Sequence, residues 1–521
     1  MAKIEDLLIK PYWKRATSAD YATTTPTTQD GGTYAMALDT QQYTAYTQKD
    51  FMNELCPSAH SINSTIYRAM RAKFKFNIAT NKFEADGWAE VERSPIAAQE
   101  GILRHKVTAT FGNDIWFGSL GKKKDEKNDE LVATFKSYWE QSGMKDALSS
   151  WGRGLYGMGD AGLYQYRNAE TNQIEYKVFT YEKGDVINKT KDAEGKDIFI
   201  RLFNLNGKQA VEIYGEKTIE LWIKNDSESE VDKGVFQKIL NWVKGAAGII
   251  SEDGYVRIKE TVHGYGRCPV AYWRLDDVVW GKGQPAIENV EKSLSDLREN
   301  NKYYAYQIMF LSGGVMSLPD AEQMGKVIAS KSENGKAEIL APADASSTFT
   351  IELEKNLKLL WWTLGMTVLS PDEIKAGENT GAFIQNLYWP EIQWAKNMIS
   401  ELRPALKEII LTFTYLVGLC EKDANSYRNM RMMFSLTPCT PRNTSEEINN
   451  ICAAKNAGLT SRQTGAEEID FNNSRELDRL LEEEQAKVAM EEEVKEADAK
   501  RQAAATRVKG QAGNNQAEGN K

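Results

Sequence analysis

The chain has 521 residues, of which 41% are apolar, so it can form two to four domains of ordinary size around a sizeable core. Its formal net charge of −9 and isoelectric point near 5.3 argue against tight, charge-driven binding of nucleic acid. The five cysteines include no C-x-x-C pair, and the three histidines show no metal-ligand spacing. We therefore expect free thiols in a reducing compartment, and neither a structural zinc site nor a Ser/His/Asp catalytic triad.

The N-terminus and the apolar runs carry no targeting or membrane signal. The first residues, MAKIEDLLIKPYWKR, lack the apolar core and cleavage site of a signal peptide. The two most apolar runs, 359–369 and 409–420, are shorter than the roughly 20 residues needed to span a bilayer. The sequence thus predicts a soluble protein made in the cytoplasm, with both runs in buried helices and no membrane contact.

Residues 12–50 are rich in Thr, Gln, Ser and Tyr, which predicts that residues 1–50 form an extended N-terminal arm that orders on a partner. The first clear helix is expected from Pro95 to Phe111. Ser94 suits its N-cap, Pro95 its first position and Gly112 the residue after its end.

A second helix is expected from near Asp129 through Leu148, on the basis of its apolar stripe. From Ala161 the apolar period falls to two, and five segments up to residue 264 have the pattern of short antiparallel strands. Asn206-Gly207 between two of them is a strong hairpin signal. This order predicts an α+β region with a strand meander rather than alternating βαβ units.

Two helices flank a separate module in the middle of the chain. The first is expected to begin at Pro285 and to keep heptad spacing as far as Leu311, with Asn301 at one core position. Segment 312–351 is rich in Gly, Ser and Ala and is predicted to be an inserted tip. A second helix then returns over 352–369.

A loop is expected over 370–381, followed by a long helix from Ala382 to Cys420 that bends at Pro390 and Pro404. A strand follows over 429–436.

Three helix starts stand close together near the end of the chain, at Thr444, Thr460 and Asn473, each with Glu or Gln three residues later. The last of these helices is strongly acidic. Residues 501–521 are of low complexity and are predicted to be disordered.

Gly157, Gly159 and Gly162 form a G-x-G-x-x-G pattern, which suggests a nucleotide site. A dinucleotide fingerprint requires a strand before the glycines and a helix after them, and this order is reversed here. No Gly-Lys pair is followed by Ser or Thr, so a P-loop is absent, and the acidic pairs 276–277 and 372–373 lack a third metal ligand. We interpret the glycines as a helix-to-strand hinge and expect no catalytic residue, metal or cofactor.

The order of these parts resembles the portal proteins of tailed double-stranded DNA bacteriophages. The resemblance covers about residues 51 to 500. It rests on four matches in the family's order: GILRHKVTATFGNDIWFGS, then KDALSSWGRGLYGMGDAGLYQY, then YGRCPVAYWRLDD before a helix carrying Asp296 and Asn300, and finally NAGLTSRQT before RELDRLLEEE.

The resemblance implies a portal fold, that is, an α/β wing, a two-helix stem, a small α/β clip and a helical crown in a ring-forming chain. The implied parts are the wing at 51–284 and 382–442, the stem at 285–311 and 352–369, the clip at 312–351, a tunnel loop at 370–381, and the crown at 443–500. It further implies a dodecameric ring at one capsid vertex of the virion, which serves as the channel for DNA packaging and ejection. The implied partners are the terminase motor, head-completion, adaptor and tail proteins, and the major capsid and scaffolding proteins.

The family likeness also assigns candidate residues. The tunnel-loop residues facing DNA would be Asp372, Glu373, Lys375, Glu378 and Asn379. Arg298 and Lys302 are candidates for the stem channel, and Lys326, Lys331 and Lys336 for clip contacts with partners. A net acidic chain suits a channel in which double-stranded DNA makes only transient contacts and slides. Two alternatives remain at this point: a nucleotide-binding or DNA-processing enzyme that uses the glycine motif, and another coiled-coil virion or scaffold protein.

Overall fold

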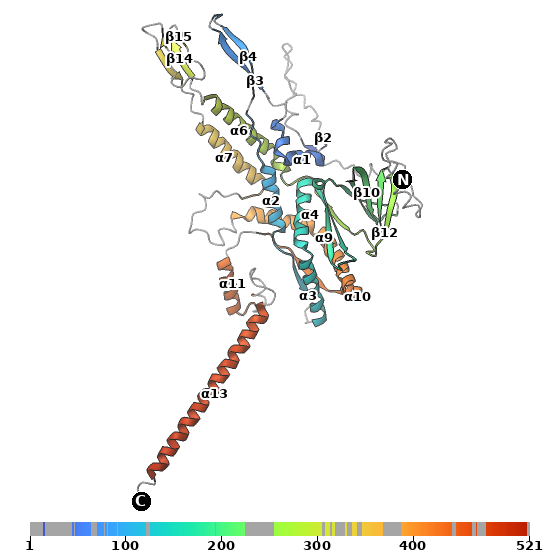
Figure 1. Ribbon diagram of the computed structural model, residues 1–521, viewed down its shortest axis with the longest axis vertical. Helices are drawn as coiled ribbons and strands as arrows, with labels where there is room; N and C mark the ends of the chain where they lie inside the picture. Colours follow the sequence, from blue (N-terminus) through green and yellow to red (C-terminus); the bar gives the residue numbers. More distant parts are fainter. Residues whose placement is uncertain are drawn as a thin grey trace, which may run out of the picture. The chain divides into compact units, whose positions relative to one another are not determined.

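The structure is a computed structural model in which the chain forms a mixed array of helices and antiparallel sheets (Figure 1). It describes residues 14–15, 44–45, 47–63, 70–77, 79–80, 82–90, 92–120, 125–192, 194–224, 255–304, 308–312, 315–317, 329–330, 336–340, 346–367, 387–439, 444–460, 465 and 476–517. The chain divides into two compact units, Met1–Glu373 with Leu387–Thr440 and Ile374–Asn386 with Pro441–Lys521. The α+β class expected from the sequence is confirmed.

Four helices and a three-stranded sheet form the main core of the first unit. The helices are α2 (Ala98–Phe111), α3 (Glu126–Gln141), α4 (Met144–Met158) and α9 (Trp389–Cys420). The sheet has the order β13-β6-β7, from Val270–Arg274, Asp160–Arg167 and Ile174–Phe179. Helix α4 packs on α2 and on β6, and α9 packs on α2, β6 and β13 (Figure 1). The rings of Phe135, Trp139 and Phe413 meet edge to face and stacked inside this core.

The first predicted helix begins later than expected. Helix α2 starts at Ala98, not at Pro95, and ends before Gly112 as predicted. Ser94 does not cap it, because its amide donates a hydrogen bond to Ser295 and its hydroxyl accepts one from Arg298. A contact distant in the sequence has therefore replaced the local cap.

The second predicted helix is two helices. Gly143 stands between α3 and α4 with a φ of +65°, and its left-handed backbone turns the chain after α3. The prediction of one continuous helix from Asp129 through Leu148 is therefore wrong. The predicted apolar stripe is confirmed at Phe135, Trp139 and Leu148, which are buried.

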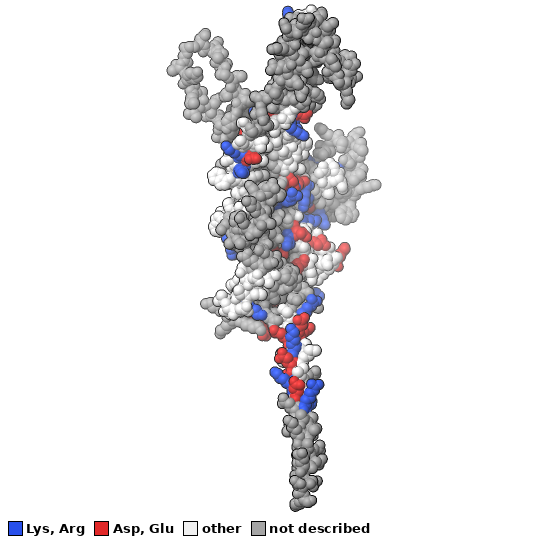
Figure 2. Space-filling model, turned by 90° about the vertical axis from the view of Figure 1, so that its left-hand side faces the viewer, with Lys and Arg blue, Asp and Glu red and all other residues white. Residues whose placement is uncertain are grey.

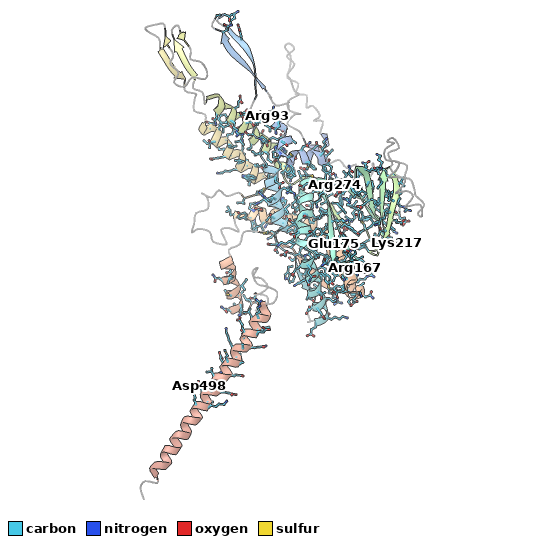
Figure 3. The ribbon with its side chains drawn as sticks, in the orientation of Figure 1. Arg93, Arg167, Glu175, Lys217, Arg274 and Asp498 are labelled. Carbon is cyan, nitrogen blue, oxygen red and sulfur yellow. The ribbon has the colours of Figure 1, made fainter. Side chains whose placement is uncertain are left out.

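The strand meander is confirmed in part, by a five-stranded antiparallel sheet of order β12-β11-β10-β9-β8. Its strands are Val186–Lys191, Asp197–Leu205, Lys208–Tyr214, Thr218–Lys224 and Tyr255–Val262, for β8 to β12 in turn. The first two predicted segments instead form β6 and β7 of the three-stranded sheet, and β8 was not among the predicted strands. Asn206 and Gly207 both have positive φ (52° and 84°), as the predicted hairpin turn requires. In the three-stranded sheet, Arg167 ends β6 opposite Ile174 of β7, and Glu175 lies opposite the preceding Tyr166 (Figure 3).

The glycine stretch lies where α4 passes into β6, so the predicted hinge is confirmed. Gly159 caps α4 with a φ of +81°. A Cβ atom on Gly154 would lie 2.1 Å from Thr180 Cγ2, and one on Gly162 would lie 2.8 Å from Phe199 Cζ. Gly154 therefore allows α4 to lie close to Thr180, and Gly162 allows β6 to lie close to Phe199. These contacts, rather than a bound phosphate, explain the glycines.

The middle helices differ in length from the prediction. Helix α6 spans Gln284–Tyr304, and the heptad does not continue to Leu311, because Ile308–Ser312 forms strand β14. Asn301 is exposed rather than in a core position. The returning helix α7 spans Ser346–Thr363, so it begins within the predicted tip and ends earlier than 369. The apolar spacing of α6 continues in the sequence into β14, so the pattern predicted one helix where the structure has a helix and a strand.

Several other elements complete the first unit. They are β1 (Lys14–Arg15), β2 (Thr44–Ala45), α1 (Gln48–Leu55), the 3-10 turns η2 (Pro57–Ala59), η3 (Ser61–Asn63), η4 (Tyr181–Lys183) and η6 (Gly281–Gly283), β3 (Met70–Asn77), β4 (Lys82–Glu90), β5 (Trp116–Ser119), β15 (Val315–Ser317), β16 (Ala329–Ser330), β17 (Lys336–Leu340), α10 (Ala424–Asn429) and β18 (Met432–Ser435). The pairs are β1-β2, β3-β4, β5-β18, β14-β17 and β15-β16. The strand expected within 429–436 is confirmed as β18.

Helix α9 begins at Trp389, so Pro390 occupies its first turn and the bend predicted there is wrong. Pro404 lies inside the helix as expected. Residues 382–386 of the predicted helix lie outside the described residues.

The second unit contains α11 (Thr444–Asn456) and α13 (Glu476–Ala517), which confirms two of the three predicted helix starts. The start at Thr460 runs into residues outside the described part. The prediction of disorder over 501–521 is wrong as far as Ala517, because the Ala-rich stretch after Lys500 continues the helix. Among the described residues, no helix is both long and apolar enough to cross a membrane.

Candidate functional site

The candidate site is the α6–α7 pair together with Thr367 and Leu387, the described residues on either side of segment 368–386. The pair is joined at its lower end, where Gly283 approaches α7 so closely that a Cβ there would lie 2.9 Å from Leu360 Cδ1. Ile287 and Val290 of α6, Leu360 of α7 and Leu364 directly after α7 are buried. Both helices are therefore fixed to the main core at this end.

A buried lysine holds the C-terminal turn of α7. Lys106 of α2 is fully buried, and its Nζ donates to the carbonyl oxygens of Leu364 (2.7 Å) and Gly365 (3.2 Å). The same ammonium lies 4.1 Å from the ring centroid of Trp394 on α9. A cation at a helix C-terminus satisfies unpaired carbonyls and complements the helix dipole. Burial lowers the pKa of Lys106 to about 8, although the charge of Glu391 acts in the opposite direction.

The ends of segment 368–386 lie next to each other. Thr367 Oγ1 donates a hydrogen bond of 2.9 Å to the carbonyl oxygen of Leu387. The predicted tunnel loop at 370–381 lies outside the described residues, between these two positions. Lys106 binds the backbone shortly before Thr367.

A second buried polar group fixes α6. His60 Nδ1 lies 2.6 Å from Glu291 Oε1, and its Nε2 donates to the carbonyl oxygen of Glu54 at 2.7 Å. Burial alone would lower the pKa of His60, but the hydrogen bond to Glu291 and its charge outweigh this and raise it. The imidazolium form is therefore favoured, because both ring nitrogens face acceptors. Glu54 also accepts a hydrogen bond from the indole of Trp280 at 2.9 Å.

Three apolar side chains of α7 face solvent in the single chain, in a stripe that also contains the exposed Lys355. Ile351, Leu359 and Trp362 are 52%, 56% and 79% exposed. Their spacings of eight and three residues place them in one stripe of a helix. Exposed apolar stripes of this kind are typical of surfaces that bind another protein.

Charge on the described surface is mixed. Figure 2 shows Lys and Arg intermingled with Asp and Glu on the face that it presents, rather than gathered into one basic field. The described residues hold no cluster of three His, Cys, Asp or Glu side chains able to bind a metal. The described residues of this face therefore form no large basic patch of the kind that a DNA-gripping protein displays.

The structure locates only some of the candidate residues named from the sequence. Arg298 lies on α6, is exposed, and donates a hydrogen bond of 3.1 Å to Ser94 Oγ. Lys302 lies near the end of α6, and Lys336 is the first residue of β17. The others lie outside the described residues: Lys326, Lys331, Asp372, Glu373, Lys375, Glu378 and Asn379. Their roles stay predictions.

Sequence reasoning missed Lys106, His60 and Glu291. Lys106 carried no signal of its own, because it follows Arg104 and His105 in one polar stretch of α2, and its partner lies 258 positions away. A lone histidine such as His60 is as often structural as functional.

Comparison with known proteins identifies the class of protein. The family profile described as "Phage portal protein, SPP1 Gp6-like" matches residues 89–490, which is well over half of the chain. The chain therefore belongs to the family of phage portal proteins. Within that class, its family is the SPP1 Gp6-like one.

Among solved structures, the chain is similar to one described as "Neck of empty GTA particle computed with C6 symmetry", with 8% identity and a TM-score of 0.37. The match covers 70% of this chain and 87% of that one. At this level of similarity we base no conclusion on it. No curated protein matches the chain.

Proposed function

We propose that the chain assembles into a closed, dodecameric ring at one vertex of the phage capsid and forms the channel through which DNA enters and leaves. The observation that carries the proposal is the family match over residues 89–490. In this role the protein is a structural conduit rather than an enzyme. It acts in the virion and is assembled in the host cytoplasm.

We propose the portal parts with boundaries adjusted to the observed elements. The stem is α6 with α7, the clip is the set of strands between them, the tunnel loop lies within 368–386, and the crown is α11 with α13. The wing comprises the core and the two larger sheets. The exposed apolar stripe of α7 supports ring formation, because a neighbouring copy would remove it from water.

The channel role also agrees with the charge of the chain. A net charge of −9 disfavours tight binding, so DNA can slide past a few basic side chains. We propose Lys375 as the main transient phosphate contact, near the acidic Asp372, Glu373 and Glu378. Arg298 is a weaker choice, since it already binds Ser94.

The partners belong to the same proposal. The ring would bind terminase during packaging and head-completion, adaptor and tail proteins afterwards, and it would contact the capsid and scaffolding proteins at the vertex. Lys326, Lys331 and Lys336 in the clip are the proposed contact residues for terminase or adaptor.

Electron microscopy of the purified protein, together with a mass measurement, tests the proposal. Rings with a central hole, each containing many copies of the 58.7 kDa chain, are expected. A stable dimer without a hole would favour a coiled-coil scaffold protein instead. Saturable ATP or NAD binding in a thermal-shift titration would favour the enzyme.

A further inference from the structure

The three-stranded sheet ends at β7, and the outer edge of this strand is open. The order β13-β6-β7 leaves one side of β7 without a neighbouring strand among the described residues. Asn168 N donates to the carbonyl oxygen of Gln173, which is its direct partner when the β6–β7 register is continued into the turn. These two residues therefore form a hydrogen-bonded pair of the ladder.

Three residues of β7 direct their backbone groups to the open side. Hydrogen-bonded and non-hydrogen-bonded pairs alternate along an antiparallel ladder, so the residues that face outward are Ile174, Tyr176 and Val178. The carbonyl oxygen of Val178 lies 3.5 Å from Lys183 Nζ, which agrees with that direction. The described residues place no partner on the N–H and C=O groups of Ile174 and Tyr176. These groups form a template on which an extended chain can pair.

A cavity of about 320 Å³ lies along this edge, between β7 and the C-terminal end of α3. It is lined by residues 173–176 at the start of β7 and by Tyr138, Gln141 and Ser142 at the end of α3. A strand added to β7 would direct every second side chain toward the α3 side of the sheet. The groove therefore has the two parts of a site for strand addition, a free edge and a side-chain pocket.

The side-chain donors that α3 contributes to the cavity are already used. Tyr138 Oη donates to Glu421 Oε1 at 2.6 Å, and Gln141 Nε2 donates to Ser137 Oγ at 3.1 Å. Ser142 Oγ donates to the carbonyl oxygen of Tyr138. The α3 side of the cavity therefore offers oxygen acceptors to a ligand.

Glu175 gives the cavity a negative charge. Hydrogen bonds from Tyr166 and Asn168, both 2.7 Å, lower the pKa of Glu175, so its carboxylate is ionised at neutral pH. A carboxylate that accepts two hydrogen bonds can accept more. Arg167 lies near Glu175 (Figure 3), but it does not line the cavity, and its Nε donates to Asn172 Oδ1 at 2.6 Å. The cavity therefore suits a cationic side chain.

We propose that this groove binds an extended segment of another protein, which pairs with β7 as an added strand and places a lysine or arginine side chain in the cavity. The inference goes beyond the channel role and does not depend on the ring. Of the two longest stretches outside the described residues, 16–43 contains no Lys or Arg, and 225–254 joins β11 to β12 in the other sheet. The charge of the cavity therefore favours a separate polypeptide as the occupant.

Fluorescence anisotropy with the full-length protein tests the groove. The probe is a fluorescein-labelled peptide, Thr-Val-Thr-Lys-Thr-Val-Thr, which carries its lysine between two valines on one face when extended. Saturable binding is expected, and it should weaken about tenfold or more when glutamate replaces the lysine or when the protein carries Glu175→Gln. Glu170→Gln is the matched control, because the exposed Glu170 lies in the same hairpin but does not line the cavity. This variant should bind the peptide as the wild type does.

A copy of the peptide with every backbone amide N-methylated keeps the charge but cannot donate to β7, so it is expected to lose binding. Equal binding of the lysine and glutamate peptides, unchanged binding by Glu175→Gln, or full binding of the methylated peptide would overturn the proposal. Absence of saturable binding would overturn it too, and is the result expected if a segment of this chain fills the groove. Thermal melts check the folding of Glu175→Gln. If that variant is unfolded, the three peptides on wild-type protein still decide the point.

Discussion

Lys106 Nζ lies 2.7 Å from the carbonyl oxygen of Leu364, and through this bond the centre of α2 holds the last turn of α7. The lysine is fully buried. A single buried cation thus binds the backbone of Leu364 and Gly365, directly after α7.

Replacement of Lys106 by Met is expected to destabilise the protein by about 1–3 kcal/mol at pH 7, because two buried carbonyls lose their donor. The wild type should gain stability between pH 8 and pH 10.5, since the unfolded chain there binds a proton that the folded chain has released. The deficit of Lys106→Met should therefore grow by up to about 3 kcal/mol across that range. Denaturant unfolding at several pH values measures it, and a pH-independent deficit would contradict the assignment.

The His60–Glu291 pair is expected to stabilise the fold at low pH and less so at high pH. The pKa of His60 is raised, so its contribution is complete below the unfolded pKa of about 6.5 and is lost as pH rises through the folded pKa. The stability advantage of wild type over His60→Gln should fall accordingly between pH 6 and pH 9. Urea unfolding of both proteins measures the difference.

His263→Gln is a control with the opposite sign. Burial lowers the pKa of His263, so its protonation in the unfolded chain costs the wild type stability as pH falls below about 6.5. If both variants showed the same trend with pH, the roles given to these histidines would be wrong.

Two glycine substitutions should act in opposite directions. Gly154→Ala places a Cβ 2.1 Å from Thr180 Cγ2 and is expected to cost about 1–3 kcal/mol through overpacking. Gly101→Ala meets no atom within 4 Å and should stabilise α2 by about 0.5–1 kcal/mol. Thermal melts of the two variants compare them directly. Equal changes in melting temperature for the two variants would show that the close contact between Gly154 and Thr180 is not needed for stability.

The apolar stripe of α7 is expected to matter for assembly and not for folding. Trp362→Ser, combined with Leu359→Ser, removes side chains that are mostly exposed, so the melting temperature should change little while the ring fraction falls. Trp116→Ser is the matched control, because Trp116 is also exposed (53%) but lies on β5. Mass photometry reports the ring fraction, and unchanged assembly of the double variant would exclude this surface.

Lys375→Glu should leave rings intact but impair DNA packaging or retention, because it replaces a proposed phosphate contact with a repelling charge. Lys127→Glu makes the same charge change on an exposed residue of α3 and should package normally. A packaging assay with both variants decides the point. Normal packaging by Lys375→Glu would count against the tunnel-loop role.

The sequence alone determined the features that arise from neighbouring residues. The change from helical to strand period at Ala161, the positive φ of Asn206 and Gly207, and the hinge at Gly159 all follow from local backbone chemistry. The order of these elements along the chain, together with several short segments, also pointed to the portal family before any packing was known.

Only the tertiary structure decided which side chains fix these elements together. Glu291 meets His60 across 231 positions, and Leu364 meets Lys106 across 258, so no local pattern could pair them. The same reason explains the misplaced start of α2, where Ser94 binds α6 instead of capping its own helix. Local propensity sets the bounds of an element unless a residue distant in the sequence forms a stronger hydrogen bond with it. Such bonds form where the two residues are buried together.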